Sequence, residues 1–134
     1  MIEQLVKASA TEMAAAVREG KVSCIDLLEA QFARVDRYNG TLNAIIWQDR
    51  DSARKLAMKL DEEAKVGNFR GPLHGVPITI KEAFDLAGAP STWGNPALKN
   101  NIPTKSSAVA QHYLDAGAVI FGKASMASMA ALAR

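Results

Sequence analysis

A lysine directly follows a short apolar strand near the middle of the chain, and its amine is the strongest candidate for chemistry in the sequence. Apolar side chains alternate with Pro77 and Thr79 over residues 76–80, the period-2 pattern of a short strand with proline near its start. In open α/β sheets, ligand sites gather at the carboxyl ends of strands, where Lys81 would lie. An amine held there against apolar neighbours loses hydration, which favours the neutral form that accepts protons. We therefore predict that Lys81 is a general base; the alternative is a lysine whose ammonium simply extends into water.

Four stretches around and after Lys81 form a distinctive pattern: GPLHGVPITIKEAFDLAG (71–88), STWGNPAL (91–98), Pro103-Thr104 and AVAQHYLDAGAVIFGK (108–123). This pattern resembles the amidase signature family of serine hydrolases, which cleave carboxamide C–N bonds, and residues 9–67 are similar to the helical N-terminal region of bacterial members. The resemblance implies that Lys81 is the base of a Ser-cisSer-Lys triad, relaying a proton through one serine to activate a second. It also implies an α/β fold in which N-terminal helices precede part of a mixed β-sheet flanked by helices.

Both serines of the family triad lie in a Gly/Ser-rich segment a few dozen residues beyond the position of Lys123, and these 134 residues contain no such segment. Ala124 and Ser125 also stand where the family usually has threonine and a polar residue. The resemblance therefore implies the N-terminal fragment of an amidase. We expect the isolated chain to be inactive, because acyl transfer needs an activated hydroxyl and oxyanion donors as well as a base.

Two other functions are compatible with the sequence. The chain could be a stand-alone interaction module, or one part of an amidase or amidotransferase that is split or built from several subunits. The strands predicted over 76–80 and 118–121 should leave at least one open edge and one poorly covered apolar face, so we also expect self-association. A small-molecule amide substrate is expected only if a further region completes the site.

Composition narrows the remaining choices. A length of 134 residues fits one domain, and a net charge of +2 with interspersed signs argues against nucleic acid or a membrane surface as partner. No apolar stretch approaches the roughly 20 residues that span a bilayer. The single Cys24 excludes an intrachain disulfide, and the N-terminus lacks a secretion signal, so the cytoplasm is expected. With two histidines and one cysteine we expect no metal site, and we expect no cofactor.

The domain is predicted to comprise a helical region over 1–70 and a strand-loop-helix-strand region over 71–134. In the first, cap and periodicity signals predict helices from Ser9 to Gly20, from Ser23 to about Asn39-Gly40 and over 49–65, with a brief strand within 42–47.

In the second region, a long ordered loop is predicted over 88–103, followed by a helix that begins after Ser106 or Ser107 and ends at Gly117. The inward side chains of this helix are predicted to be Val109, Tyr113 and Leu114. The strand over 118–121 should lie parallel to that over 76–80, so Lys81 and Lys123 would emerge at the same edge of the sheet.

Several other motifs are better explained by structure than by chemistry. Residues 117–123 match part of a phosphate-binding loop. Such a loop needs small, flexible residues, whereas residues 118–121 are typical of a strand. Ser52 and Lys55 have the S-x-x-K spacing of penicillin-recognising enzymes on what is predicted to be a solvated helix face. We interpret His74 as a turn histidine bonded to backbone, His112 as a surface residue, and Lys123 as a structural residue that holds nearby carbonyls or a carboxylate. We do not interpret Ser125 or Ser128 as a substitute nucleophile.

Overall fold

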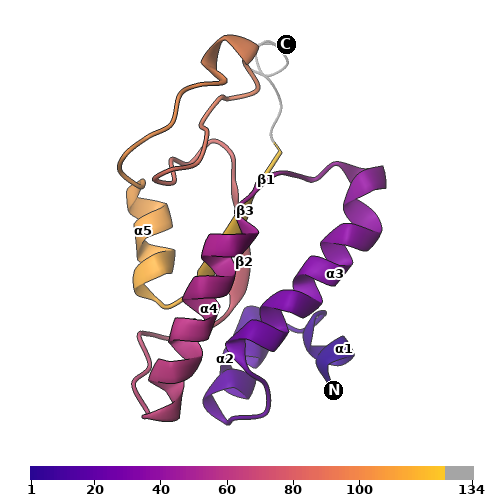
Figure 1. The fold of residues 1–134 in the computed structure, drawn as a ribbon, viewed down its shortest axis with the longest axis vertical. Helices are drawn as coiled ribbons and strands as arrows, with labels where there is room; N and C mark the ends of the chain where they lie inside the picture. The colour runs from indigo at the N-terminus through magenta and orange to yellow at the C-terminus, as the bar shows by residue number, and fades with distance from the viewer. Residues whose placement is uncertain (126–134) are drawn as a thin grey trace.

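Residues 1–125, the part of the chain that the computed structural model describes, form five α-helices and three strands, with three helices before the first strand (Figure 1). This α/β architecture agrees with the predicted fold class. The elements are α1 (Ile2–Leu5), α2 (Ala10–Arg18), α3 (Cys24–Leu42), β1 (Ile45–Gln48), α4 (Arg50–Lys65), β2 (Pro77–Lys81), the 3₁₀ turn η1 (Pro96–Leu98), α5 (Ala108–Asp115) and β3 (Val119–Ala124).

Side-chain caps begin the helices where the sequence predicts them. The Ser9 hydroxyl accepts a hydrogen bond from the Glu12 N–H at 3.2 Å, and the Glu12 carboxylate accepts one from the Ser9 N–H at 2.8 Å. This capping box starts α2, and Ser23 and Ser107 cap α3 and α5 in the same way with a single bond each.

The C-terminal end of α3 lies beyond the predicted end near Asn39-Gly40. The helix continues to Leu42, because Asn43 adopts the left-handed conformation (φ 49°) that ends it. Asn39 remains helical, and its side-chain amide bonds both the N–H and the carbonyl of Ile45 at 2.9 Å. The predicted helix end was therefore two to three residues too early, and the asparagine instead ties the helix to the start of β1.

The sheet has the strand order β1-β3-β2, with β3 parallel to β2, as predicted, and antiparallel to β1. Strand β3 runs to Ala124, three residues beyond the predicted end, so Lys123 lies inside the strand rather than after it. Within residues 1–125, β2 has a strand partner on one side only. Its outer edge is the open edge that the sequence predicts.

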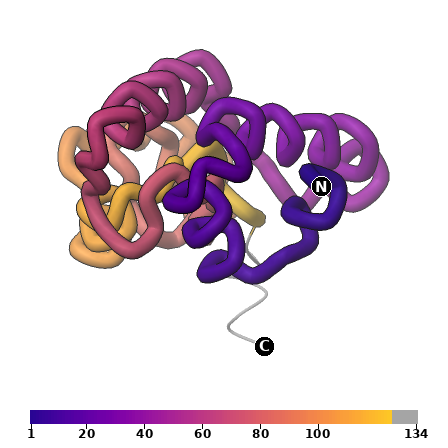
Figure 2. Tube along the Cα trace, turned by 90° about the horizontal axis from the view of Figure 1, so that it is seen from below, coloured from indigo at the N-terminus to yellow at the C-terminus, as the bar shows by residue number. Residues whose placement is uncertain are grey.

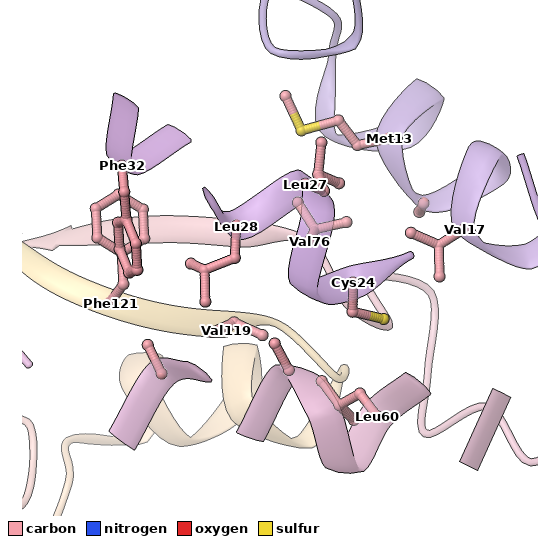
Figure 3. Packing of buried hydrophobic residues seen from close by; sticks show 13 residues of the cluster. Met13, Val17, Cys24, Leu27, Leu28, Phe32, Leu60, Val76, Val119 and Phe121 are labelled. Carbon is pink, nitrogen blue, oxygen red and sulfur yellow. The ribbon is translucent and has the colours of Figure 1, made fainter. Parts of the chain in front are cut away.

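The larger apolar cluster joins α2, α3 and α4 to one face of the sheet (Figure 3). The rings of Phe32 and Phe121 meet edge to face with centroids 5.3 Å apart, which anchors the middle of α3 on β3. Figure 2 shows α3 running beside α4, with α1 and the N-terminus next to α3. The cluster consists of Met13, Ala14, Val17, Cys24, Leu27, Leu28, Phe32, Ala53, Ala57, Leu60, Val76, Val119 and Phe121.

A smaller cluster lies where α5 packs on the sheet, and it corrects the predicted inward face of that helix. Ala110 is fully buried and Leu114 partly buried, whereas Val109 and Tyr113 are about 40% exposed. Residues four apart share a helix face, so Ala110 with Leu114 and Val109 with Tyr113 form two different faces. The prediction was therefore right for Leu114 and wrong for Val109 and Tyr113.

An open hollow of about 510 Å³ lies between α3 and β2 and is lined in part by Val35, Tyr38, Ile78 and Phe121. None of the helices within residues 1–125 has the length and apolarity needed to cross a membrane.

Candidate active site

Lys81 is the last residue of β2, whereas the sequence predicts it as the first residue after the strand. Its side chain is exposed. Its backbone is held on both sides: it pairs with Ala124 in the parallel register, and its carbonyl accepts a hydrogen bond from the Phe84 N–H at 3.0 Å. The amine therefore projects from a fixed position at the carboxyl end of the strand. Residues 1–125 do not bury it, so the predicted loss of hydration is not produced by this part of the chain.

The buried lysine of the sheet is Lys123, which is 0% exposed. Its Nζ donates a hydrogen bond to the Pro90 carbonyl at 2.9 Å, which confirms the interpretation that this lysine holds a nearby carbonyl. Burial lowers the pKa of Lys123, and the negative charges of Glu82 and Asp85 oppose this effect in part.

Lys81 and Lys123 reach the same end of the sheet, as predicted, but they are one register position apart. Lys123 pairs with Ile80, whereas Lys81 pairs with Ala124. Because side chains alternate across a strand, the two amines belong to opposite faces of the sheet.

Glu82, the residue after Lys81, is a buried carboxylate that the sequence reading did not select. It is 2% exposed, and its two oxygens accept hydrogen bonds from the backbone N–H groups of Thr92 and Trp93, the latter at 2.9 Å. Its own N–H donates to the Ala124 carbonyl at 2.9 Å. Glu82 thus connects the end of the sheet to the loop over 88–103.

Further hydrogen bonds give that loop its predicted order. The Ser91 N–H donates to the Asn101 carbonyl, and the Asn101 side chain donates to the Ser91 carbonyl at 2.8 Å. Ser91 is itself fully buried. The loop is therefore a closed structure held against the ends of β2 and β3 through Glu82 and Lys123.

Comparison with known proteins now identifies the family. A model of the Amidase family matches residues 26–134. The chain belongs to this family. An acylamidase of Rhodococcus erythropolis is 39% identical over 115 residues, which cover 86% of this chain and 24% of the relative. A subunit of the glutamyl-tRNA(Gln) amidotransferase of Lachnospira eligens is 34% identical over 122 residues, covering 91% of this chain and 25% of that protein.

Solved structures agree with the sequence comparison. The structure of a fatty acid amide hydrolase superposes with a TM-score of 0.88 at 25% identity, covering 94% of this chain and 22% of that one. The chain thus spans about a quarter of the length of the amidase-family relatives that it matches. The resemblance to an N-terminal portion of the family is confirmed.

His74 and His112 lie as we predicted, in a turn and on the surface. The Nδ1 atom of His74 accepts from the Arg70 N–H at 3.0 Å, and Nε2 lies 2.9 Å from the Leu60 carbonyl, so Nε2 carries the proton of a neutral ring. His112 is exposed on α5, and Ser52 is exposed on α4. Ser125 is exposed, and Ser128 lies outside the described residues. Within residues 1–125, no three His, Cys, Asp or Glu side chains gather as metal ligands.

Proposed function

We propose that this chain supplies the base of an amidase that hydrolyses carboxamide C–N bonds, with Lys81 as the general base. The observation that carries the proposal is the placement of Lys81. It combines an exposed amine with a backbone fixed by the β3 register and by the turn to Phe84, at the carboxyl end of a parallel strand. Membership of the amidase family supports the reaction class.

In the proposed reaction, the neutral amine of Lys81 accepts a proton through a bridging serine from a second serine. The second serine attacks the carbonyl carbon of the amide, and the C–N bond breaks as the leaving amine takes up a proton. Water then hydrolyses the acyl-serine ester and restores the free hydroxyl. The two serines must come from a further region of the enzyme.

Ser91, in the loop over 88–103, is a poor substitute for them, because its hydroxyl is buried and donates to the Glu82 carbonyl at 3.5 Å. A hydroxyl enclosed in this way cannot reach a substrate. We therefore propose that the isolated chain is inactive and acts only with a portion that carries both serines.

An assembly of several subunits is a second candidate, because several relatives of similar identity are named as a subunit of an amidotransferase. In that assembly Lys81 would have the same role, and the partner subunits would supply the other reactions. Co-purification of this chain with partner chains from its own cell would favour this candidate over a single split amidase.

The test is reconstitution. The chain is combined with the C-terminal portion of an active relative that carries both serines, and ammonia release from a primary amide is measured. Lys81→Ala should lower kcat by at least about a hundredfold, the usual scale of general acid-base catalysis. The matched control is Lys55→Ala, which removes an exposed lysine from α4 and should leave the rate unchanged. Equal rates for the two variants would remove Lys81 from the mechanism.

The isolated chain provides an independent check. It should not react with a serine-directed fluorophosphonate probe, whereas the reconstituted amidase should be labelled on the C-terminal portion. Stoichiometric labelling of a serine in the isolated chain would contradict its proposed inactivity.

A further inference from the structure

Two open hollows flank the C-terminal half of α3. The first is the hollow of about 510 Å³ between α3 and β2, and the second, also of about 510 Å³, lies between α1 and α3. Arg34 and Tyr38 line both, so these two side chains lie where the hollows meet. Apolar side chains line much of each hollow: Val35, Ile78 and Phe121 in the first, and Ile2, Val6 and Ala30 in the second.

Large apolar side chains are exposed along the same part of α3. Tyr38 is 46% exposed and Leu42 is 69% exposed. Because residues four apart share a helix face, Arg34, Tyr38 and Leu42 form one stripe on the helix. An exposed apolar surface with a polar border is characteristic of a site where another chain binds, and tyrosine and arginine are enriched in such sites.

The charges around this stripe are positive. The hollow between α1 and α3 is lined by the cations Lys7, Arg34 and Arg37 and by one carboxylate, that of Glu3. The part of the chain that the structure describes contributes no carboxylate to the hollow beside β2. None of the ion pairs within residues 1–125 involves the three cations. The surface therefore combines apolar hollows with cations that have no partner carboxylate among residues 1–125.

The two arginines are held in place without such a carboxylate. The Arg34 Nη1 donates a hydrogen bond to the Val6 carbonyl at 2.7 Å, which leaves further N–H donors on the guanidinium. The Arg37 guanidinium lies 5.2 Å from the centre of the Tyr38 ring, within the range of a cation–π contact. A carboxylate of another chain can therefore bind these guanidinium groups without first breaking an ion pair.

We propose that this face of α3 binds an acidic amphipathic segment of a partner chain. Apolar side chains of that segment enter the two hollows, and its carboxylates pair with Lys7, Arg34 and Arg37, as when an amphipathic helix binds in a groove. A phosphate backbone is also attracted to cations, but it has no apolar groups to fill the hollows. The inference goes beyond the proposed function, because it does not involve the chemistry of Lys81.

The experiment measures binding of a peptide to the whole chain. The probe is a fluorescein-labelled helical peptide with leucine on one face and glutamate on the other, followed by fluorescence anisotropy at physiological ionic strength. It should bind saturably, and the same peptide with lysine in place of every glutamate should bind at least about tenfold more weakly. This comparison keeps the apolar face constant and changes only the charge.

Variants of the chain test the charges and the apolar stripe separately. Reversing two exposed charges together, with Lys7→Glu and Arg37→Glu, should weaken binding of the glutamate peptide at least about tenfold and strengthen binding of the lysine peptide. Lys55→Glu, on α4 and away from both hollows, is the control and should change the affinity less than about twofold. Tyr38→Ala should also weaken binding at least about tenfold, whereas Tyr113→Ala, which removes a similarly exposed tyrosine from α5, should not.

Each other outcome overturns the inference. The cations do not select the partner if the glutamate peptide fails to bind, if both peptides bind alike, or if the charge reversals change nothing. If a single-stranded oligonucleotide or vesicles of phosphatidylglycerol bind and the glutamate peptide does not, the surface binds phosphate groups instead.

Two competing occupants are tested with the same peptide. If the C-terminal portion of an active relative blocks peptide binding, that portion covers the face. If Tyr38→Ala abolishes self-association of the chain and leaves peptide binding unchanged, a second copy covers it. Either result overturns the inference and leaves the proposed function of Lys81 unaffected.

Discussion

Replacing Lys123 tests whether the end of the sheet is held by the buried stem and amine that the structure shows. The side chain is fully buried in β3, and its ammonium bonds the Pro90 carbonyl at 2.9 Å. Lys123→Ala removes the aliphatic stem and the donor together. Lys123→Met removes the charge and the donor but keeps most of the stem, so the two variants separate packing from hydrogen bonding.

The expected magnitudes follow from these losses. Truncating a buried long side chain to alanine costs about 2–5 kcal/mol, and leaving the Pro90 carbonyl without its donor adds about 1–3 kcal/mol. Release of the buried charge offsets part of this cost, because an ammonium in an apolar site is itself unfavourable. We expect Lys123→Ala to lower the free energy of unfolding by about 3–5 kcal/mol and Lys123→Met by less than about 2 kcal/mol.

Urea unfolding followed by circular dichroism measures the effect. Lys81→Ala is the matched control, since Lys81 is exposed at the neighbouring register position and should change stability by no more than about 0.5 kcal/mol. If Lys81→Ala destabilises the chain as much as Lys123→Ala does, or if Lys123→Ala costs less than about 1 kcal/mol, the structural role assigned to Lys123 is refuted.

The same variants predict a pH dependence. The pKa of Lys123 is lowered in the folded state, mainly by burial, so between the folded pKa and the unfolded value of 10.5 the unfolded chain binds more protons. Wild-type stability should therefore rise with pH across that window relative to Lys123→Met, which has no group to titrate there. A difference between the two proteins that stays constant from neutral pH to about pH 10 would contradict the lowered pKa.

Three further predictions concern the core and the sheet edge. Gly75→Ala should destabilise the chain by about 2–5 kcal/mol in urea unfolding, because a Cβ there would lie 2.3 Å from the Cys24 sulfur at a φ of +81°. Gly88→Ala is the control, because Gly88 also has a positive φ but an added Cβ there would meet no atom within 4 Å. If the two variants lose the same free energy of unfolding, the clash with Cys24 is not the cause. Burial raises the pKa of the Cys24 thiol, and the nearby Asp61 carboxylate raises it further, so iodoacetamide should label Cys24 in urea and not in the folded chain. The open edge of β2 and the hollow beside it should make elution in size-exclusion chromatography depend on concentration, and a single elution volume over a hundredfold range would count against this.

Local signals in the sequence determined most of the elements. The capping box at Ser9 and the caps at Ser23 and Ser107 set helix starts, since each involves residues only three apart. Alternation over 76–80 was enough to predict β2, and the apolar run before Lys123 was enough to predict a parallel β3. The likeness of the motif around Lys81 to the amidase family is also a property of the sequence alone.

Contacts between distant segments decided the rest. Asp61 of α4 accepts hydrogen bonds from the N–H groups of Cys24 and Ile25, and no pattern over a short window indicates a bond across more than 35 residues. The inner face of α5, the burial of Lys123 and the bonds from Glu82 to the loop depend in the same way on which elements meet. Periodicity specifies which side chains share a face, but only packing specifies what that face contacts. For this reason the sequence could select Lys81 as a candidate base, whereas the burial of the next residue, Glu82, became visible only in the folded chain.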